Sequence, residues 1–192
     1  MAKKYDFRPD PEGSGDFGKL LLTKLQRRNL MRWSSYALIC IVGLLLQDVF
    51  LSRTVILGAT PDIVPCIILM ICVMQGAEIG SVFVLTASCL YYFSGSAPGP
   101  YVIPVLVGIG VFLVIFRQSY LKQGFITILV CSAVGMLVYE LCIFCIGLFL
   151  ERTVWARFGV FTTTALLSLV AVPVAYPILM SIGKLGGDTW KE

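Results

Sequence analysis

The chain has 192 residues, of which 58% are hydrophobic and only 14% are charged, and its formal net charge is +4. Soluble domains use about 45–50% apolar residues, so the composition excludes a large soluble domain and indicates a membrane-embedded chain. The positive balance comes from basic residues that flank apolar stretches, and it gives no reason to expect a nucleic-acid partner.

The apolar stretches predict an all-α fold, a polytopic membrane protein with a bundle of six transmembrane helices. A bilayer core of about 30 Å needs roughly 20 apolar residues per helix, and fewer where a helix packs inside a bundle. Turn-forming residues at 75–78 and 94–100 bound the short third and fourth stretches. In chain order the predicted spans are 33–51, 55–74, 79–93, 101–116, 124–150 and 159–182.

The distribution of lysine and arginine predicts that both termini lie in the cytoplasm. With that orientation only three of the fifteen basic residues, Arg53, Arg152 and Arg157, fall on the outer side. This asymmetry fits the positive-inside rule. The chain is therefore expected to divide into a cytoplasmic tail (1–32), a transmembrane domain (33–183) and a second short cytoplasmic tail (184–192).

The N-terminal tail has two parts with different expected behaviour. Residues 1–18 carry charges, prolines and glycines without a periodic apolar face, which predicts disorder. Residues 19–32 can place an apolar stripe beside a basic face on a helix, which would suit the anionic inner surface of a membrane lipid bilayer. An equally good interpretation is a basic segment that only orients the first span.

Seven cysteines lie within the predicted spans, where free cysteine usually acts as a small buried hydrophobe. Cys142 and Cys145 have the spacing of a C-x-x-C motif, but the chain contains no histidine that could complete a mixed metal site. We therefore expect no disulfide framework, no metal and no cofactor.

The acidic residues of the spans do not suggest an active site. Asp48 and Asp62 are predicted near the outer interface, Glu78 near the inner one, and Glu140 alone in the fifth span. Paired carboxylates or a histidine are the usual groups for acid–base catalysis, and the expected placement offers neither. The sequence predicts that the protein is not an enzyme.

Glu140 stands out because a charge at the centre of a membrane helix costs about 2.5–3.5 kcal/mol on insertion scales. It is a candidate for a buried contact with a partner helix or a polar ligand. It is also explained structurally if it is protonated, hydrogen-bonded within the bundle, or closer to the outer interface than the span limits suggest.

Small residues at Gly76 and Gly80, and again at Gly108 and Gly110, have spacings that allow close approach of helices. Such spacing is frequent in glycine-rich membrane chains. Packing within the bundle is the simplest account of it.

The second span opens with a short signature, residues 58–62. Gly58 permits an unusual backbone angle in a turn, and Pro61 suits the first helical position. Asp62, in the first helical turn, would be attracted to the positive end of the helix dipole. These residues predict a sharp re-entry into the membrane.

The signature and its surroundings resemble the MreD family of bacterial rod-shape-determining membrane proteins. The resemblance includes Leu44–Gln47 at the end of the first span, and it continues loosely through 94–95 and 98–100. The family has a glycine and an acid late in its third span, whereas residues 87–92 contain neither. The residues that carry the match are Gln47, Gly58, Pro61, Asp62, Gly76 and Gly80.

The resemblance implies a non-enzymatic scaffold of the bacterial cell-wall elongation machinery, located in the cell membrane. Its implied partners are an MreC-like bitopic protein, an MreB-like actin homologue, and the cell-wall synthesis polymerase and transpeptidase. Apolar grooves on the bundle would hold the single helix of a partner.

A different class of protein also fits the length, six helices and topology. This alternative is the substrate-binding membrane subunit of an energy-coupling-factor type vitamin or metal transporter. Such a subunit needs several polar or aromatic groups around an outward-facing pocket. Tyr91, Tyr92, Tyr101, Trp155 and Arg157 could rim the outer side, but aromatic residues there are usually interfacial anchors, and no convergent set of buried polar groups is evident.

Overall fold

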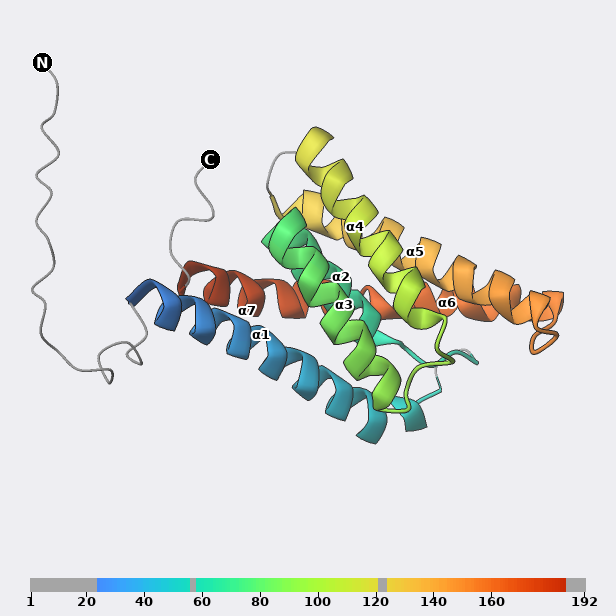
Figure 1. Cartoon of the computed structure of the whole chain (residues 1–192). Helices are drawn as coiled ribbons and strands as arrows, with labels where there is room; N and C mark the ends of the chain where they lie inside the picture. Colours follow the sequence, from blue (N-terminus) through green and yellow to red (C-terminus); the bar gives the residue numbers. More distant parts are fainter. Residues whose placement is uncertain (1–23, 56–57, 121–123, 186–192) are drawn as a thin grey trace, which may run out of the picture.

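The computed structural model describes residues 24–55, 58–120 and 124–185, and the described part is built from helices (Figure 1). The expected tail disorder (1–18) and most of the C-terminal tail lie outside the described residues. The helices are α1 (Lys24–Val49), η2 (Leu51–Arg53), α2 (Ile63–Gln75), α3 (Ala77–Phe93), α4 (Val102–Tyr120), α5 (Phe125–Phe149), η3 (Trp155–Arg157), α6 (Phe158–Ser168) and α7 (Ala171–Leu185).

Within the described ranges, four helical segments are long and apolar enough to cross a membrane, which indicates a membrane-embedded protein. They are Leu30–Arg53, Val102–Ser119, Phe125–Phe149 and Trp155–Gly183. The second and third predicted spans correspond to α2, with 13 residues, and α3, with 17 residues. Both are shorter than a typical span of roughly 20 residues, so the predicted number of six spans is not confirmed.

The first helix differs from its expected limits. It begins at Lys24 and runs without interruption to Val49, whereas the predicted span starts at residue 33. The part of the basic segment that is described, 24–32, therefore continues the axis of the first span and is not a separate helix.

The second predicted span is also corrected at its start. The prediction places it at residue 55, but α2 begins at Ile63, after a non-helical stretch that includes Pro61. Proline disfavours helical backbone in the residue before it, so the chain stays non-helical up to Pro61 before α2 begins.

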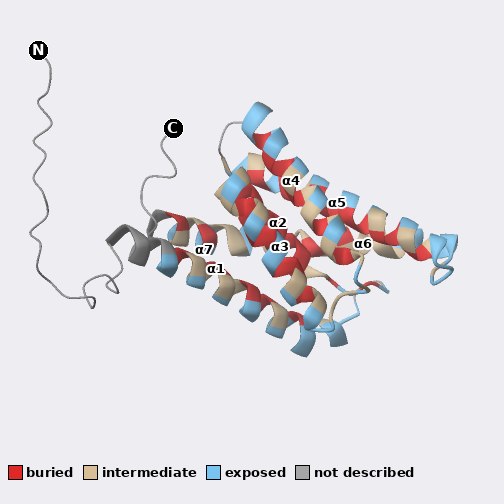
Figure 2. Ribbon diagram, viewed as in Figure 1, coloured by how far each residue is buried: buried red, intermediate tan, exposed pale blue. Residues whose placement is uncertain are grey.

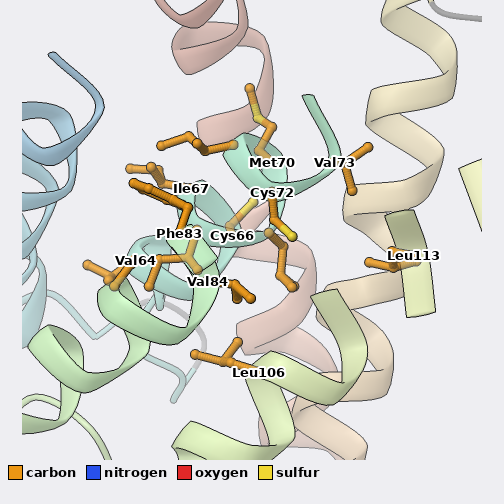
Figure 3. Packing of buried hydrophobic residues seen from close by; sticks show 14 of the residues in the cluster. Val64, Cys66, Ile67, Met70, Cys72, Val73, Phe83, Val84, Leu106 and Leu113 are labelled. Atoms are coloured by element: carbon orange, nitrogen blue, oxygen red, sulfur yellow. The ribbon is translucent and has the colours of Figure 1, made fainter. Parts of the chain in front are cut away.

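Helix α2 is the centre of the fold. It contacts α1, α3, α4, α5 and α7, and every residue from Val64 to Met74 is buried. A helix that is apolar on all sides is expected to be buried on all sides. Figure 3 shows buried side chains of α2 together with Phe83, Leu106 and Leu113 from the neighbouring helices, which belong to the same hydrophobic cluster.

Two of the small residues that predict close helix packing are confirmed in that role. A Cβ atom on Gly80 would lie 2.5 Å from the backbone oxygen of Cys72, and one on Gly110 would lie 3.2 Å from the Cys72 Sγ. Both glycines therefore allow α3 and α4 to approach α2. Gly108 has no neighbouring atom within 4 Å of such a Cβ, so the expectation is wrong for that residue.

The sixth predicted span is broken into α6 and α7. The break falls just before Pro173, and Pro177 lies inside α7. Each proline removes a backbone donor and crowds the preceding turn, which predicts a bend in this span. Helix α7 then lies beside α1, as Figure 1 shows and the contacts between them confirm.

The outer surface of the bundle is apolar. Figure 2 shows exposed residues along the outward faces of the helices, and many of them are large hydrophobics such as Leu38, Phe112, Ile126 and Val174. An apolar surface of this extent suits lipid and not water. Cys145 is exposed on it, so the expectation that all cysteines are buried is wrong for this one.

Candidate functional site

Gln47 and Asp62 meet where α1 ends and α2 begins. The Gln47 Nε2 donates a hydrogen bond of 2.7 Å to the Asp62 Oδ1, and the Tyr91 hydroxyl donates one of 2.8 Å to the Asp62 Oδ2. The Asp62 backbone N–H donates to the Ser168 Oγ at 2.8 Å. We call these four residues the Gln47–Asp62 unit, and it ties α1, the start of α2, α3 and α6 together.

The predicted position of Asp62 in the first helical turn needs a small correction. Asp62 occupies the N-cap position of α2, but its side chain makes no capping hydrogen bond. The Gln47 Oε1 instead accepts a bond of 2.9 Å from the backbone N–H of Val64, which is one of the orphan donors of the first turn. Pro61 precedes the helix and does not occupy its first position. The Asp62 carboxyl is unavailable for capping because Gln47 and Tyr91 bind it.

Two of the glycines that carry the resemblance occupy backbone positions that glycine suits best. Gly58 has φ +78° and Gly76 has φ +88°, a region that other L-residues rarely enter. The unusual angle predicted for Gly58 is thus confirmed. Gly76 joins α2 directly to α3, and this single-residue junction explains how the two helices reverse direction so tightly.

A polar cavity of about 560 Å³ opens beside the Gln47–Asp62 unit. It is bounded by the end of α1, the entry to α2, the middle of α5, and the segment that leads into α6. The polar and aromatic side chains that line it are Gln47, Asp48, Ser52, Thr60, Asp62, Ser96, Tyr101, Tyr139, Glu140, Arg152, Thr153, Arg157, Phe161 and Thr164.

Glu140 reaches this cavity from α5, together with Asp62. Glu140 is buried, with only 6% of the residue exposed, and it lines the same cavity as Asp62. The expectation that Glu140 stands alone, away from the other carboxylates, is therefore wrong. So is the expectation that no polar groups converge, because the bundle brings α1, α2 and α5 side chains to one cavity.

The sequence interpretation missed the role of two side chains of the Gln47–Asp62 unit. Tyr91 was expected at the outer rim, but it is fully buried and binds Asp62. A tyrosine within an apolar helix usually places its hydroxyl on a polar partner, and that signal was available. Ser168 was not singled out, since nothing in the sequence distinguishes it from other small residues of a span.

A second hollow, the apolar groove, lies between α1 and the α6–α7 segment on the outside of α2. Its volume is about 590 Å³, and its walls are aliphatic. The residues along it include Leu38, Val42, Leu46, Ile67, Leu167, Val170, Val174 and Ile178. Several of these are exposed, so the groove is open to whatever surrounds the bundle.

The arrangement is suited to binding. Within the described ranges, no group of three histidine, cysteine, aspartate or glutamate side chains is placed to hold a metal ion. The polar cavity can accept a charged or hydrogen-bonding group, and the apolar groove can accept an apolar helix or acyl chain.

Comparison of the chain with family models, with curated proteins and with solved structures found no match in any of the three.

Proposed function

We propose that the protein is a non-enzymatic membrane scaffold of the bacterial cell-wall elongation machinery, as the resemblance to the MreD family implies. The observation that supports this most is the direct contact between Gln47 and Asp62, two of the residues that carry the resemblance. Gln47 and Asp62, fifteen positions apart, bind each other directly, and Gly58 and Gly76 take backbone angles that favour glycine. Each of these four matching residues thus has a definite structural role in this chain.

In this proposal the apolar groove holds the single transmembrane helix of an MreC-like partner. Groove recognition of an apolar helix needs a long aliphatic cleft with close packing. The apolar groove follows α1 and α7. Its lining combines small residues (Gly43, Ala171 and Ala175) with branched ones (Val42 and Ile178). The MreB-like protein and the synthesis polymerase and transpeptidase would join through this partner or at the ends of the bundle.

The test is recovery of the full-length protein from native membranes in a gentle detergent, with mass spectrometry of the recovered proteins. The expected result is co-recovery of an MreC-like bitopic protein and cell-wall synthesis enzymes, and rounded cells after deletion. Recovery of none of these proteins, with unchanged cell shape, would refute the scaffold function.

A groove-filling substitution makes the test specific. We expect Val174→Trp, which places a bulky ring in the apolar groove, to reduce partner recovery about tenfold, since a clash of roughly 1–3 kcal/mol opposes packing there. The matched control is Val82→Trp, a similarly exposed valine on α3 that does not line the groove. Equal recovery of the partner with both variants, measured by quantitative immunoblot, would place the partner elsewhere.

The polar cavity favours a second candidate function, the substrate-binding subunit of an uptake transporter. Its volume falls within the roughly 300–1,000 Å³ typical of small-molecule sites. This function predicts co-recovery with an ATPase-linked energising module and an effect of deletion on uptake, without loss of cell shape. The same recovery experiment separates the two candidates.

A further inference from the structure

We propose that the polar cavity binds a small zwitterionic ligand, with a primary ammonium group beside Glu140 and a phosphate group toward Arg152 and Arg157. This inference goes beyond the scaffold function and does not depend on it. The ligand chemistry is that of phosphoethanolamine, either as a free compound or as a lipid headgroup.

The position for the ammonium group follows from the surroundings of Glu140. Glu140 is buried, with 6% of the residue exposed, its side chain lines the cavity, and no described residue donates a hydrogen bond to its carboxyl or forms an ion pair with it. A buried carboxyl without a partner is costly. An ionisable residue at membrane depth usually marks a functional site with a partner of its own.

Asp62 adds negative charge near the position of the ammonium group, but its own oxygens already have hydrogen-bond donors. Both of its carboxyl oxygens already accept hydrogen bonds, from Gln47 and Tyr91, which hold it in place near Glu140. Asp48, at the exposed edge, is a third acidic residue of the lining. Three acidic groups in one cavity, only one of them without a hydrogen-bond donor, select a positive group at a single place.

The position for the phosphate follows from the two arginines. Arg152 and Arg157 line the same cavity from the segment between α5 and α6, are exposed, and form no ion pair with any residue in the described ranges. A guanidinium matches phosphate geometry through parallel N–H donors. The acidic interior and the basic edge therefore match the two ends of a zwitterion.

The size and walls of the cavity argue against a bare ion as the occupant. A volume of about 560 Å³ is that of a small-molecule site. Tyr101, Tyr139 and Phe161 contribute aromatic surface to the lining, and aromatic faces attract organic ammonium groups. These features suit a molecule with a carbon framework between its charges.

The test uses the purified full-length protein and isothermal titration calorimetry. Free O-phosphoethanolamine is the first probe, with ethanolamine and inorganic phosphate as probes for each half. We expect the whole zwitterion to bind more tightly than either half. In a second arm the protein is placed in nanodiscs that contain phosphatidylethanolamine or only phosphatidylglycerol, and retained lipid is identified by native mass spectrometry.

Substitutions locate the binding. Glu140→Gln keeps the shape and removes the charge, and we expect it to weaken binding about tenfold or more, while thermal unfolding shows that the protein stays folded. Arg157→Gln should weaken binding of the phosphate-bearing probe but not of ethanolamine. The matched control is Glu78→Gln, an exposed carboxylate in the first turn of α3 that does not line the cavity.

The outcomes are distinct. Binding of the free probe that depends on Glu140 supports a soluble ligand, and selective retention of phosphatidylethanolamine that depends on Glu140 supports a lipid headgroup. Absence of binding in both arms, or binding that Glu140→Gln leaves unchanged in a folded protein, would overturn the proposal. The scaffold function is tested separately, by partner recovery, so its failure and the failure of this proposal can be told apart.

Discussion

Replacement of Gly80 by alanine is expected to destabilise the protein by about 1–3 kcal/mol, the usual cost of forcing extra volume into a packed core. The added Cβ would lie 2.5 Å from the Cys72 backbone oxygen. A backbone oxygen cannot rotate away as a flexible side chain can, so α3 must move from α2 as a whole. Because α2 contacts five other helices, the displacement would disturb the centre of the fold.

Gly108→Ala is the matched control for this prediction. It makes the same change inside a helix, but no atom lies within 4 Å of the new Cβ. Removal of a helical glycine favours the helix by about 0.5–1 kcal/mol, so this variant should be slightly more stable. Reversible unfolding in mixed detergent micelles measures both changes, and equal stability of the two variants would contradict the packing argument.

The helical, membrane-embedded character of the protein was predictable from the sequence because it depends on local composition. The limits of α5 match the predicted span to within a residue at each end, since the apolar run there is long and the glycine at 124 and the turn after Leu150 are clear signals. The predicted length of the second span is too great, because it starts at residue 55 and α2 begins only at Ile63. Apolar residues at 55–57 resemble a membrane segment, but the turn at Gly58 and the proline at 61 delay the helix until Ile63.

The candidate site was only partly predictable, because its parts come from distant positions. The sequence identified Gln47, Asp62 and Glu140 separately. That Gln47 caps α2 and binds Asp62 depends on how α1 packs against α2. That Glu140 shares a cavity with Asp62 depends on the rotation of α5 about its own axis. A hydropathy pattern gives the length of a helix but leaves the direction of each polar side chain undetermined in an apolar helix with no amphipathic face.

Gln47→Leu is expected to lower the free energy of unfolding by about 2–4 kcal/mol, because it removes two hydrogen bonds at once. The Asp62 Oδ1 loses its 2.7 Å donor and the Val64 N–H loses its 2.9 Å acceptor. A buried polar group left without a partner costs about 1–3 kcal/mol. Leucine has a volume near that of glutamine and fits an apolar neighbourhood, so the loss reports on hydrogen bonding and not on a cavity.

Gln118→Leu is the control for that substitution, since Gln118 is exposed at the end of α4 and such changes usually stay within about 0.5 kcal/mol. A double-mutant cycle of Gln47→Leu with Asp62→Leu then isolates the pair. If the Gln47–Asp62 bond holds α1 against α2, the two substitutions together should cost about 1–2 kcal/mol less than the sum of the separate losses. Strictly additive losses would mean that Gln47 stabilises the fold only through the Val64 N–H, and Gln47 and Asp62 would then lack the mutual contact that supports the scaffold proposal.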